Sequence, residues 1–314
     1  MTARVLVTGA SGFVARALLS RDVPGFEFVP SSRKSRAANN GVGRRSPDLS
    51  ALSDWGAILE GIDAVVHLAG RVHLPPGKES AAYLAENCDG TIKLARDAIA
   101  AGVRRFVFVS SAKVFGDESG ATPFSEKSPA LPEDAYAASK LAAEEGLFSL
   151  GSQMEIAILR PPLVYGPGVK ANFLALLAAV ARGVPLPLAN VRNRRSLISV
   201  DNLAAAIVGC LKSPVSAART YCVSDGPPLS TPDLVRAIAT ALGKSPRLFA
   251  FPPWLLESCG AIIGRPETIK RLTRSLELDD RAIRTELGWR PVQSFEEAIA
   301  QTARWYETRV SGSY

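Results

Sequence analysis

The sequence predicts an α/β fold in which a doubly wound parallel sheet is joined to a smaller, interleaved C-terminal domain. Three observations predict it. Short continuous apolar runs alternate with helical patterns through about the first 165 residues, and a glycine-rich turn follows the first run directly. After Pro161 and Pro162, proline and glycine become frequent. Strand–helix alternation of this kind is typical of a parallel sheet with helices on both faces.

Each element is expected from its local pattern. The strands are short apolar runs, as expected of strands buried on both faces, and they lie at 5–7, 26–29, 64–68, 106–109 and 156–159. Helices are expected at 12–19, 83–101 and 136–150, with further helical blocks at 172–182 and 232–242. Segments near 197–225 are expected to return to the first part of the fold. Because crossovers in such sheets are right-handed, ligands are expected at the carboxyl ends of the strands.

The turn after the first strand reads T-G-A-S-G-F-V-A at 8–15. Gly9 allows a tight turn, Gly12 lets the backbone approach a pyrophosphate, and the small Ala15 lets the following helix pack on the sheet. Its place between a strand and a helix predicts a Rossmann-type dinucleotide-binding domain over residues 1–165. Residues 166–314 are then expected to be mainly a substrate-binding domain.

The end of the second strand bears on the choice of cofactor. An NAD-binding fold usually has an acidic side chain there for the ribose hydroxyls, whereas residues 29–36 contain Arg33 and Lys34 and no acid. Either basic side chain could hold a 2′-phosphate, so the sequence favours NADP and leaves NAD possible. The alternative is that both belong to a solvated basic loop.

Tyr136 and Lys140 form a Y-x-x-x-K motif in an expected helix. Residues four apart share a helix face, so the ammonium can lie beside the phenol. A nearby positive charge is expected to lower the phenol pKa, so that Tyr136 can exchange a proton with a sugar or alcohol oxygen. Ser111 follows the 106–109 strand and could orient that oxygen. We therefore expect Ser111, Tyr136 and Lys140 to be catalytic, with Lys140 also binding the nicotinamide ribose.

Composition argues against several other classes of protein. The four cysteines are scattered and there are two histidines, so no metal site is expected and a reducing compartment is favoured. The chain runs directly into a strand and charges break its longest apolar stretches, so we expect a cytoplasmic protein without a transmembrane segment. The net charge of +7 suits an anionic ligand. Its basic clusters lack the interleaved aromatic residues of a nucleic-acid site.

These motifs together give the sequence a resemblance to the extended short-chain dehydrogenase/reductases, the NAD-dependent epimerase/dehydratase group acting on nucleotide sugars. The resemblance covers nearly the whole chain. Besides the turn at 8–15, its marks are Asp48-Leu49, H-L-A-G at 67–70, Asn87 before Gly90-Thr91, S-S-A-K-V-F-G at 110–116, Y-A-A-S-K at 136–140, R-P-P-L-V-Y-G-P at 160–167, R-R-S-L-I-S-V-D-N-L at 194–203 and L-G-W-R-P at 287–291.

The resemblance implies roles for further residues. It places Asp48 and Leu49 near the adenine, Ala69 near a cofactor ribose, and Pro161 to Val164 beside the nicotinamide. The wider set of cofactor contacts that it implies comprises Gly9, Ser11, Gly12, Phe13, Val14, Leu68, Gly70 and Asn87. Asn172 and Arg195 match positions that contact the nucleotide-sugar diphosphate, a task that suits the guanidinium fork of Arg195.

Two departures from the family pattern guide the choice of reaction. A typical sugar 4-epimerase has a small or hydroxyl residue where Lys113 stands and a tyrosine where Phe115 stands. The segments S-x-K-V and R-L-T-R-S-L-E-L-D (271–279) resemble bacterial 4-keto reductases that make sugars for surface polysaccharide. Lys113 adjoins the serine strand end and could contact the substrate.

The resemblance therefore favours a 4-keto reductase acting on a UDP-linked 6-deoxy-N-acetylhexosamine. A UDP-sugar 4-epimerase is the alternative, and a non-catalytic NADP-sensing regulator is a remote one. A helix-mediated homodimer is common among the proteins that the sequence resembles.

Overall fold

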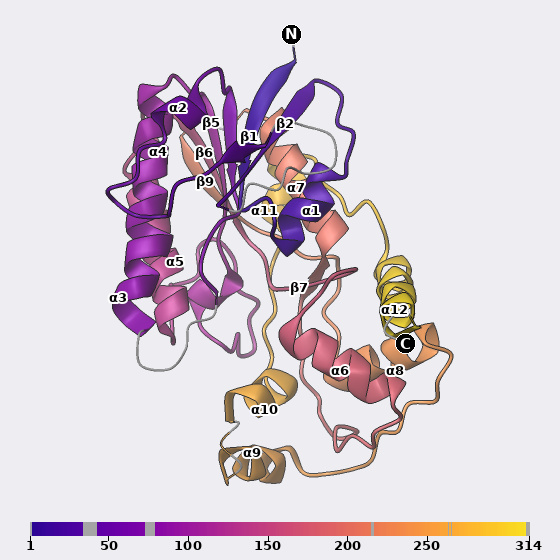
Figure 1. Cartoon of the computed structure of the whole chain (residues 1–314). Helices are drawn as coiled ribbons and strands as arrows, with labels where there is room; N and C mark the ends of the chain where they lie inside the picture. Colours follow the sequence, from indigo (N-terminus) through magenta and orange to yellow (C-terminus); the bar gives the residue numbers. More distant parts are fainter. Residues whose placement is uncertain are drawn as a thin grey trace.

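In the computed structural model, which describes residues 2–33, 43–72, 79–214, 217–262, 264 and 266–311, seven parallel strands form the main sheet (Figure 1). Their order is β3-β2-β1-β4-β5-β6-β9. The strands are β1 (Ala3–Thr8), β2 (Phe26–Ser32), β3 (Arg44–Arg45), β4 (Ala64–His67), β5 (Arg105–Val109), β6 (Glu155–Arg160) and β9 (Ala218–Cys222). The α/β, doubly wound prediction is confirmed.

Helices cover both faces of this sheet (Figure 1). Val5 and Val7 of β1 face a buried cluster that includes α1 (Phe13–Leu19), α7 (Val200–Lys212) and α11 (Arg281–Glu286). Leu6, between them, faces the opposite cluster with α2 (Gly56–Leu59), α4 (Gly90–Ala100) and α5 (Ala135–Phe148). Successive side chains of a strand point to opposite faces, so a strand covered on both sides must be apolar at every position.

The helix expected at 83–101 is divided. The chain forms α3 (Glu79–Tyr83), a π-helical turn η1 (Leu84–Asp89) and then α4. The wider turn accompanies the buried Asn87, whose Nδ2 donates to the Arg71 carbonyl and to Ser139 Oγ, at 3.0 Å each. Single π turns in helices are often found at functional sites, and this one ties the loop after β4 to α5.

The remaining elements form a second layer beyond the carboxyl edge of the sheet (Figure 1). A two-stranded parallel sheet of β7 (Leu163–Tyr165) and β8 (Leu197–Ser199) packs with α6 (Ala171–Ala181), α8 (Thr231–Ala241) and α12 (Phe295–Ser311) in one buried cluster. The helices α9 (Pro253–Ile262) and α10 (Pro266–Thr273) extend from this layer. Between β8 and α8 the chain returns to the main sheet, where β9 pairs with β6.

Asn202 fastens three distant segments of the chain. Its side chain, fully buried on α7, donates from Nδ2 to Asp225 Oδ1 (2.7 Å) and to the Gln293 carbonyl (3.0 Å). Its Oδ1 accepts the backbone N–H groups of Val292 (2.8 Å) and Gln293 (3.1 Å). All four hydrogen-bonding positions of the amide are therefore used inside the protein.

We predict that Asn202→Ala lowers the free energy of unfolding by about 2–3 kcal/mol, because it removes the side chain that pairs the backbone N–H groups of Val292 and Gln293 and the Gln293 carbonyl. Urea denaturation followed by circular dichroism measures this change. Asn190→Ala removes an exposed asparagine and serves as the control, with an expected change under about 0.5 kcal/mol. Equal effects of the two variants would contradict the role given to Asn202.

Candidate active site

The expected site residues meet where the parallel strands end. Gly9 follows β1, Ala69 follows β4, Ser111 follows β5 and Pro161 follows β6. These strands are neighbours in the sheet, so their carboxyl ends share one edge. The Ala112 N–H donates to the Pro161 carbonyl at 2.9 Å, which joins the serine turn directly to the segment after β6.

The glycine turn has the shape that its sequence predicts. Gly9 has a φ of +68°, and a Cβ there would lie 2.8 Å from the Ala69 backbone nitrogen. A Cβ on Gly12 would lie 2.9 Å from the Gly9 carbonyl oxygen, which the Gly12 N–H already reaches at 2.7 Å. Gly12 begins α1 without a side-chain cap, leaving first-turn N–H groups for an anion. This backbone cradle fits the pyrophosphate of a dinucleotide.

His67 joins neighbouring strand ends beneath the turn. Its Nδ1 lies 2.7 Å from Thr8 Oγ1 and its Nε2 lies 2.9 Å from Thr91 Oγ1. Burial, with a smaller effect of the nearby Lys140, lowers the pKa of His67 to about 3. The ring is therefore neutral at physiological pH, and its role is structural: it links Thr8 and Thr91 by hydrogen bonds.

The structure brings Ser111, Tyr136 and Lys140 together. Tyr136 and Lys140 lie one turn apart on α5, and Ser111 begins the short 3₁₀ helix η2 (Ala112–Phe115). The Ser111 hydroxyl lies near enough to Tyr136 to lower the pKa of the phenol. Lys140 is buried, with Nζ 4.0 Å from the centroid of the Phe108 ring on β5. The serine and the phenol can thus share one substrate oxygen, and their catalytic roles stay a prediction.

The electrostatics of this trio differ from the sequence expectation. Burial raises the pKa of Tyr136 to about 12, the charge of Asp134 adds to the rise, and the Ser111 hydrogen bond opposes it. Burial also lowers the pKa of Lys140 to about 7, against the raising effect of Glu144. The expectation of a lowered phenol pKa is therefore wrong, because desolvation disfavours the charged forms of both Tyr136 and Lys140.

A buried ionic network lies directly behind Ser111, Tyr136 and Lys140. Arg160 Nε donates to Glu144 Oε2 at 3.0 Å, and Ser110 Oγ hydrogen-bonds the same carboxylate. Glu144 and Arg160 are 1% and 6% exposed. The sequence alone did not predict this network. One feature of the sequence could have indicated it: Glu144 lies one turn after Lys140 on the buried face of α5, and a buried carboxylate requires a cation or hydrogen-bond donors as partners.

In the loops that follow β2 and β4, the basic residues Arg33 and Arg71 have acidic partners. Arg33 lies 3.5 Å from Asp48, and Arg71 pairs with Glu86. These four residues, with Leu49, Ser50, Ala82 and Ala85, line a cavity of about 370 Å³. Lys34 lies outside the described residues. Reading of a 2′-phosphate by Arg33 and Lys34 stays a prediction.

The three expected substrate residues have different surroundings. Asn172 is exposed in the first turn of α6. Arg195 is half-buried and donates to the Arg274 carbonyl at 2.9 Å, and burial lowers its pKa to about 10. Lys113 forms ion pairs with Asp134 and, at 3.4 Å, with Asp117. Substrate contact by each of the three stays a prediction.

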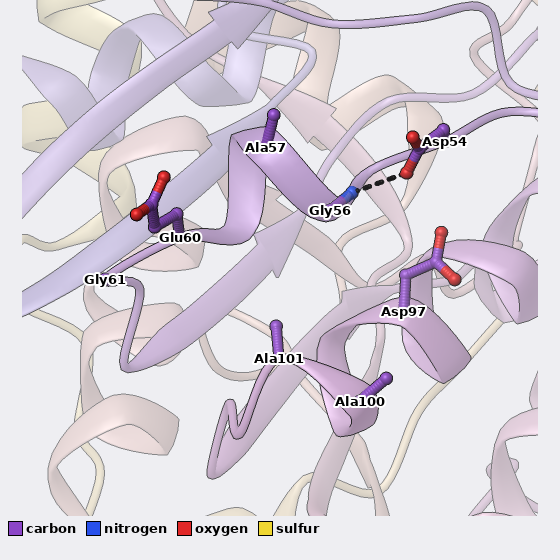
Figure 2. Close-up of a pocket in the computed structure, with 8 residues that line it drawn as sticks. All are labelled: Asp54, Gly56, Ala57, Glu60, Gly61, Asp97, Ala100 and Ala101. Atoms are coloured by element: carbon purple, nitrogen blue, oxygen red, sulfur yellow. Dashed lines mark hydrogen bonds between the residues drawn. The ribbon is translucent and has the colours of Figure 1, made fainter.

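Figure 2 shows a larger hollow, of about 550 Å³, that lies away from this site. It is lined by Asp54, Gly56, Ala57, Glu60, Gly61, Asp97, Ala100 and Ala101. Gly61 and Ala101 precede β4 and β5, so the hollow opens at the amino ends of the strands. Asp97 pairs with Lys93, and Asp54 accepts the Gly56 N–H at 2.9 Å. The hollow offers none of the groups that the catalytic edge provides.

The described residues provide neither a metal site nor a membrane-spanning helix. Within them, no group of three or more histidine, cysteine, aspartate or glutamate residues is arranged to hold a metal ion. None of the helices among them has the length and apolar character that crossing a membrane requires.

Comparisons with known proteins agree with this geometry. Residues 5–223 match the NAD dependent epimerase/dehydratase family. A UDP-glucose 4-epimerase from Vibrio cholerae is 38% identical, over 97% of this chain and 95% of its own. The solved structure of MoeE5 in complex with UDP-glucuronic acid and NAD has a TM-score of 0.77 and 25% identity, over 98% of this chain and 100% of its own. RMD from Pseudomonas aeruginosa, complexed with NADPH, shares the fold with a TM-score of 0.77 and 24% identity, over the same shares of the two chains.

We predict that Tyr136→Phe lowers turnover by on the order of 10²–10⁴-fold, because it removes the phenolic proton donor, while cofactor affinity stays within a few-fold. Turnover assays and fluorescence titration of the cofactor measure the two quantities. Tyr221→Phe is the matched control, because that hydroxyl lies 3.0 Å from Glu286 away from the catalytic trio. Near-normal turnover of the Tyr136 variant would remove the residue from the mechanism.

Proposed function

The chain belongs to the NAD-dependent epimerase/dehydratase family, and on that premise we propose that it is a UDP-sugar 4-epimerase. The observation that carries this choice is the 38% identity to a UDP-glucose 4-epimerase across almost the full length of both chains. The coarser conclusion, an NAD(P)-dependent enzyme that modifies a nucleotide sugar, rests on the family match as well.

This proposal reverses the order of the two candidates favoured by the sequence motifs. The case for a 4-keto reductase used Lys113 as a substrate contact and Arg33 as a reader of NADP. Both cations have carboxylate partners within the chain, Lys113 in Asp134 and Asp117, and Arg33 in Asp48. The Arg33 pair is long and exposed, at 3.5 Å with side chains 63% and 82% exposed, whereas Lys113 pairs with two carboxylates, so Lys113 supports a reductase less than its sequence position suggested.

In the proposed reaction, Tyr136 and Ser111 act on the hydroxyl at sugar carbon 4. Ser111 donates a hydrogen bond to that oxygen, and the Tyr136 oxygen removes its proton as the carbon is oxidised to a ketone. An oxidised nicotinamide, when bound, would accept the hydride from carbon 4 and return it to the other face of the keto sugar after that sugar has rotated, and its positive charge would favour the phenolate. Tyr136 then returns the proton to the carbon-4 oxygen. The sugar therefore leaves inverted at carbon 4, with no net oxidation.

Retention of the cofactor follows from this chemistry. Each cycle restores the cofactor to its starting state, so exchange with solvent serves no purpose. The backbone cradle at Gly9 and Gly12 and the Asn87 bridge between the β4 loop and α5 suit a cofactor that is held between turnovers. A reductase, by contrast, must release an oxidised cofactor after every turnover.

We predict that the purified protein interconverts UDP-glucose and UDP-galactose, or their N-acetylated counterparts, without added cofactor. Heat denaturation should release about one nicotinamide dinucleotide per chain, and mass spectrometry of the released material identifies it as NAD or NADP. Anion-exchange chromatography measures the formation of the opposite 4-epimer over time.

The contrary result is equally clear. Protein that arrives without cofactor and oxidises NADPH stoichiometrically with a 4-keto nucleotide sugar would establish the reductase instead. Tyr136→Phe, purified in parallel, is the control for epimerisation by a contaminating enzyme.

A further inference from the structure

Lys113 connects the serine turn to the tyrosine helix. It lies on η2, two residues after Ser111, and its side chain pairs with Asp134 just before α5 and with Asp117 in the loop after η2. The side chains of Lys113 and Asp117 are 24% and 18% exposed, and that of Asp134 is 42% exposed, so water reaches the cluster from the Asp134 side. The pair Lys113–Asp134 therefore joins the two segments that supply the catalytic hydroxyls.

Asp134 has a second task at the same place. It is the N-cap of α5, and its Oδ1 accepts the Ala137 N–H at 2.7 Å, while Oδ2 contacts Lys113. It precedes Tyr136 by two residues. One carboxylate thus caps the start of α5, and its charge raises the pKa of the Tyr136 phenol.

We propose that Lys113 is a positioning residue: by pairing with Asp134 it fixes the start of α5 against the serine turn and offsets the negative charge beside the Tyr136 phenol. The inference rests on the proposed function only in that Tyr136 moves the proton. It assigns Lys113 to the protein's own carboxylates rather than to the sugar.

The groups around the phenol support this assignment. Burial and the Asp134 charge raise the pKa of Tyr136, the Ser111 hydrogen bond lowers it, and Tyr83, edge-on at 6.1 Å, raises it. The pKa of Asp134 is lowered overall: burial would raise it, but hydrogen bonds from Lys113 and the Ala137 N–H and the charges of Lys113 and Arg271 outweigh burial. Asp134 is therefore ionised at neutral pH and needs a counter-charge close to it. Lys140, on the tyrosine's own helix, is a further basic group near the phenol, and burial lowers its pKa to about 7.

Removing one charge at a time tests the idea. In Lys113→Met the Asp134 charge is uncompensated, so the acid limb of the kcat/KM profile should move to higher pH by about 0.5–1 unit, with KM for the UDP-sugar within about twofold. Asp134→Asn keeps the capping oxygen and loses the charge, so it should move the limb to lower pH. The double variant Lys113→Met/Asp134→Asn should return close to the wild-type profile.

A measurement without substrate separates this inference from the proposed function. In cofactor-free protein labelled with ¹³C-tyrosine, the Tyr136 resonance is assigned with Tyr136→Phe and followed by NMR up to about pH 11. The onset of its titration should move upward in Lys113→Met, downward in Asp134→Asn, and back in the double variant. The outcome holds whichever nucleotide sugar the enzyme accepts.

Lys93→Met is the matched control, because Lys93 pairs with Asp97 on the solvent side of α4 at 2.6 Å with similar exposure. It should leave both titrations unchanged. The proposal would be overturned if Lys113→Met raised KM strongly, left both titrations in place, and was not rescued by Asp134→Asn. That pattern would make Lys113 a contact of the substrate.

Discussion

The ion pair between Glu144 and Arg160 is the interaction on which the catalytic edge depends. An isolated buried charge is costly, and breaking one partner of such a pair typically destabilises a protein by about 3–5 kcal/mol. Here the carboxylate also receives the Ser110 hydroxyl, and the guanidinium lies 4.6 Å from the Phe115 ring. The pair is therefore fully surrounded and has one favourable geometry.

The position of this pair explains the alignment of the active site. Ser110 directly precedes Ser111, Glu144 lies one turn beyond Lys140, and Arg160 directly precedes Pro161. The end of β5, the face of α5 and the end of β6 are thus fixed to one another from behind. The same burial removes water from Lys140 and Tyr136. It raises the pKa of the phenol and lowers the pKa of the ammonium, so the neutral form of each group is favoured. Burial thus gives the site a rigid geometry but makes the phenol a weaker acid. Neighbouring charges such as Asp134 therefore have a large effect on the pKa of the phenol.

Local patterns predicted the features that depend on local sequence. The central strands, the turn at Gly9 and the helix bearing Tyr136 and Lys140 each follow from residues within one or two turns of each other. Features that depend on distant partners were missed. Lys113 and Arg160 are both basic residues in the sequence, yet each is paired with a carboxylate that only the fold places beside it, Asp134 and Glu144. The π turn at Asn87 likewise accompanies hydrogen bonds to two distant residues, Arg71 and Ser139.

The most direct test of this account replaces the whole network by apolar residues, as Ser110→Ala/Glu144→Leu/Arg160→Met. Buried ion pairs can often be replaced in this way without loss of stability, so the melting temperature should stay within a few degrees, about the shift of a 1 kcal/mol change. Because misplacing a catalytic group by about 1 Å can cost on the order of 10²-fold in rate, kcat should fall about 10- to 100-fold while the cofactor stays bound. A folded variant with wild-type kcat would contradict the claim that this ion pair aligns the catalytic residues.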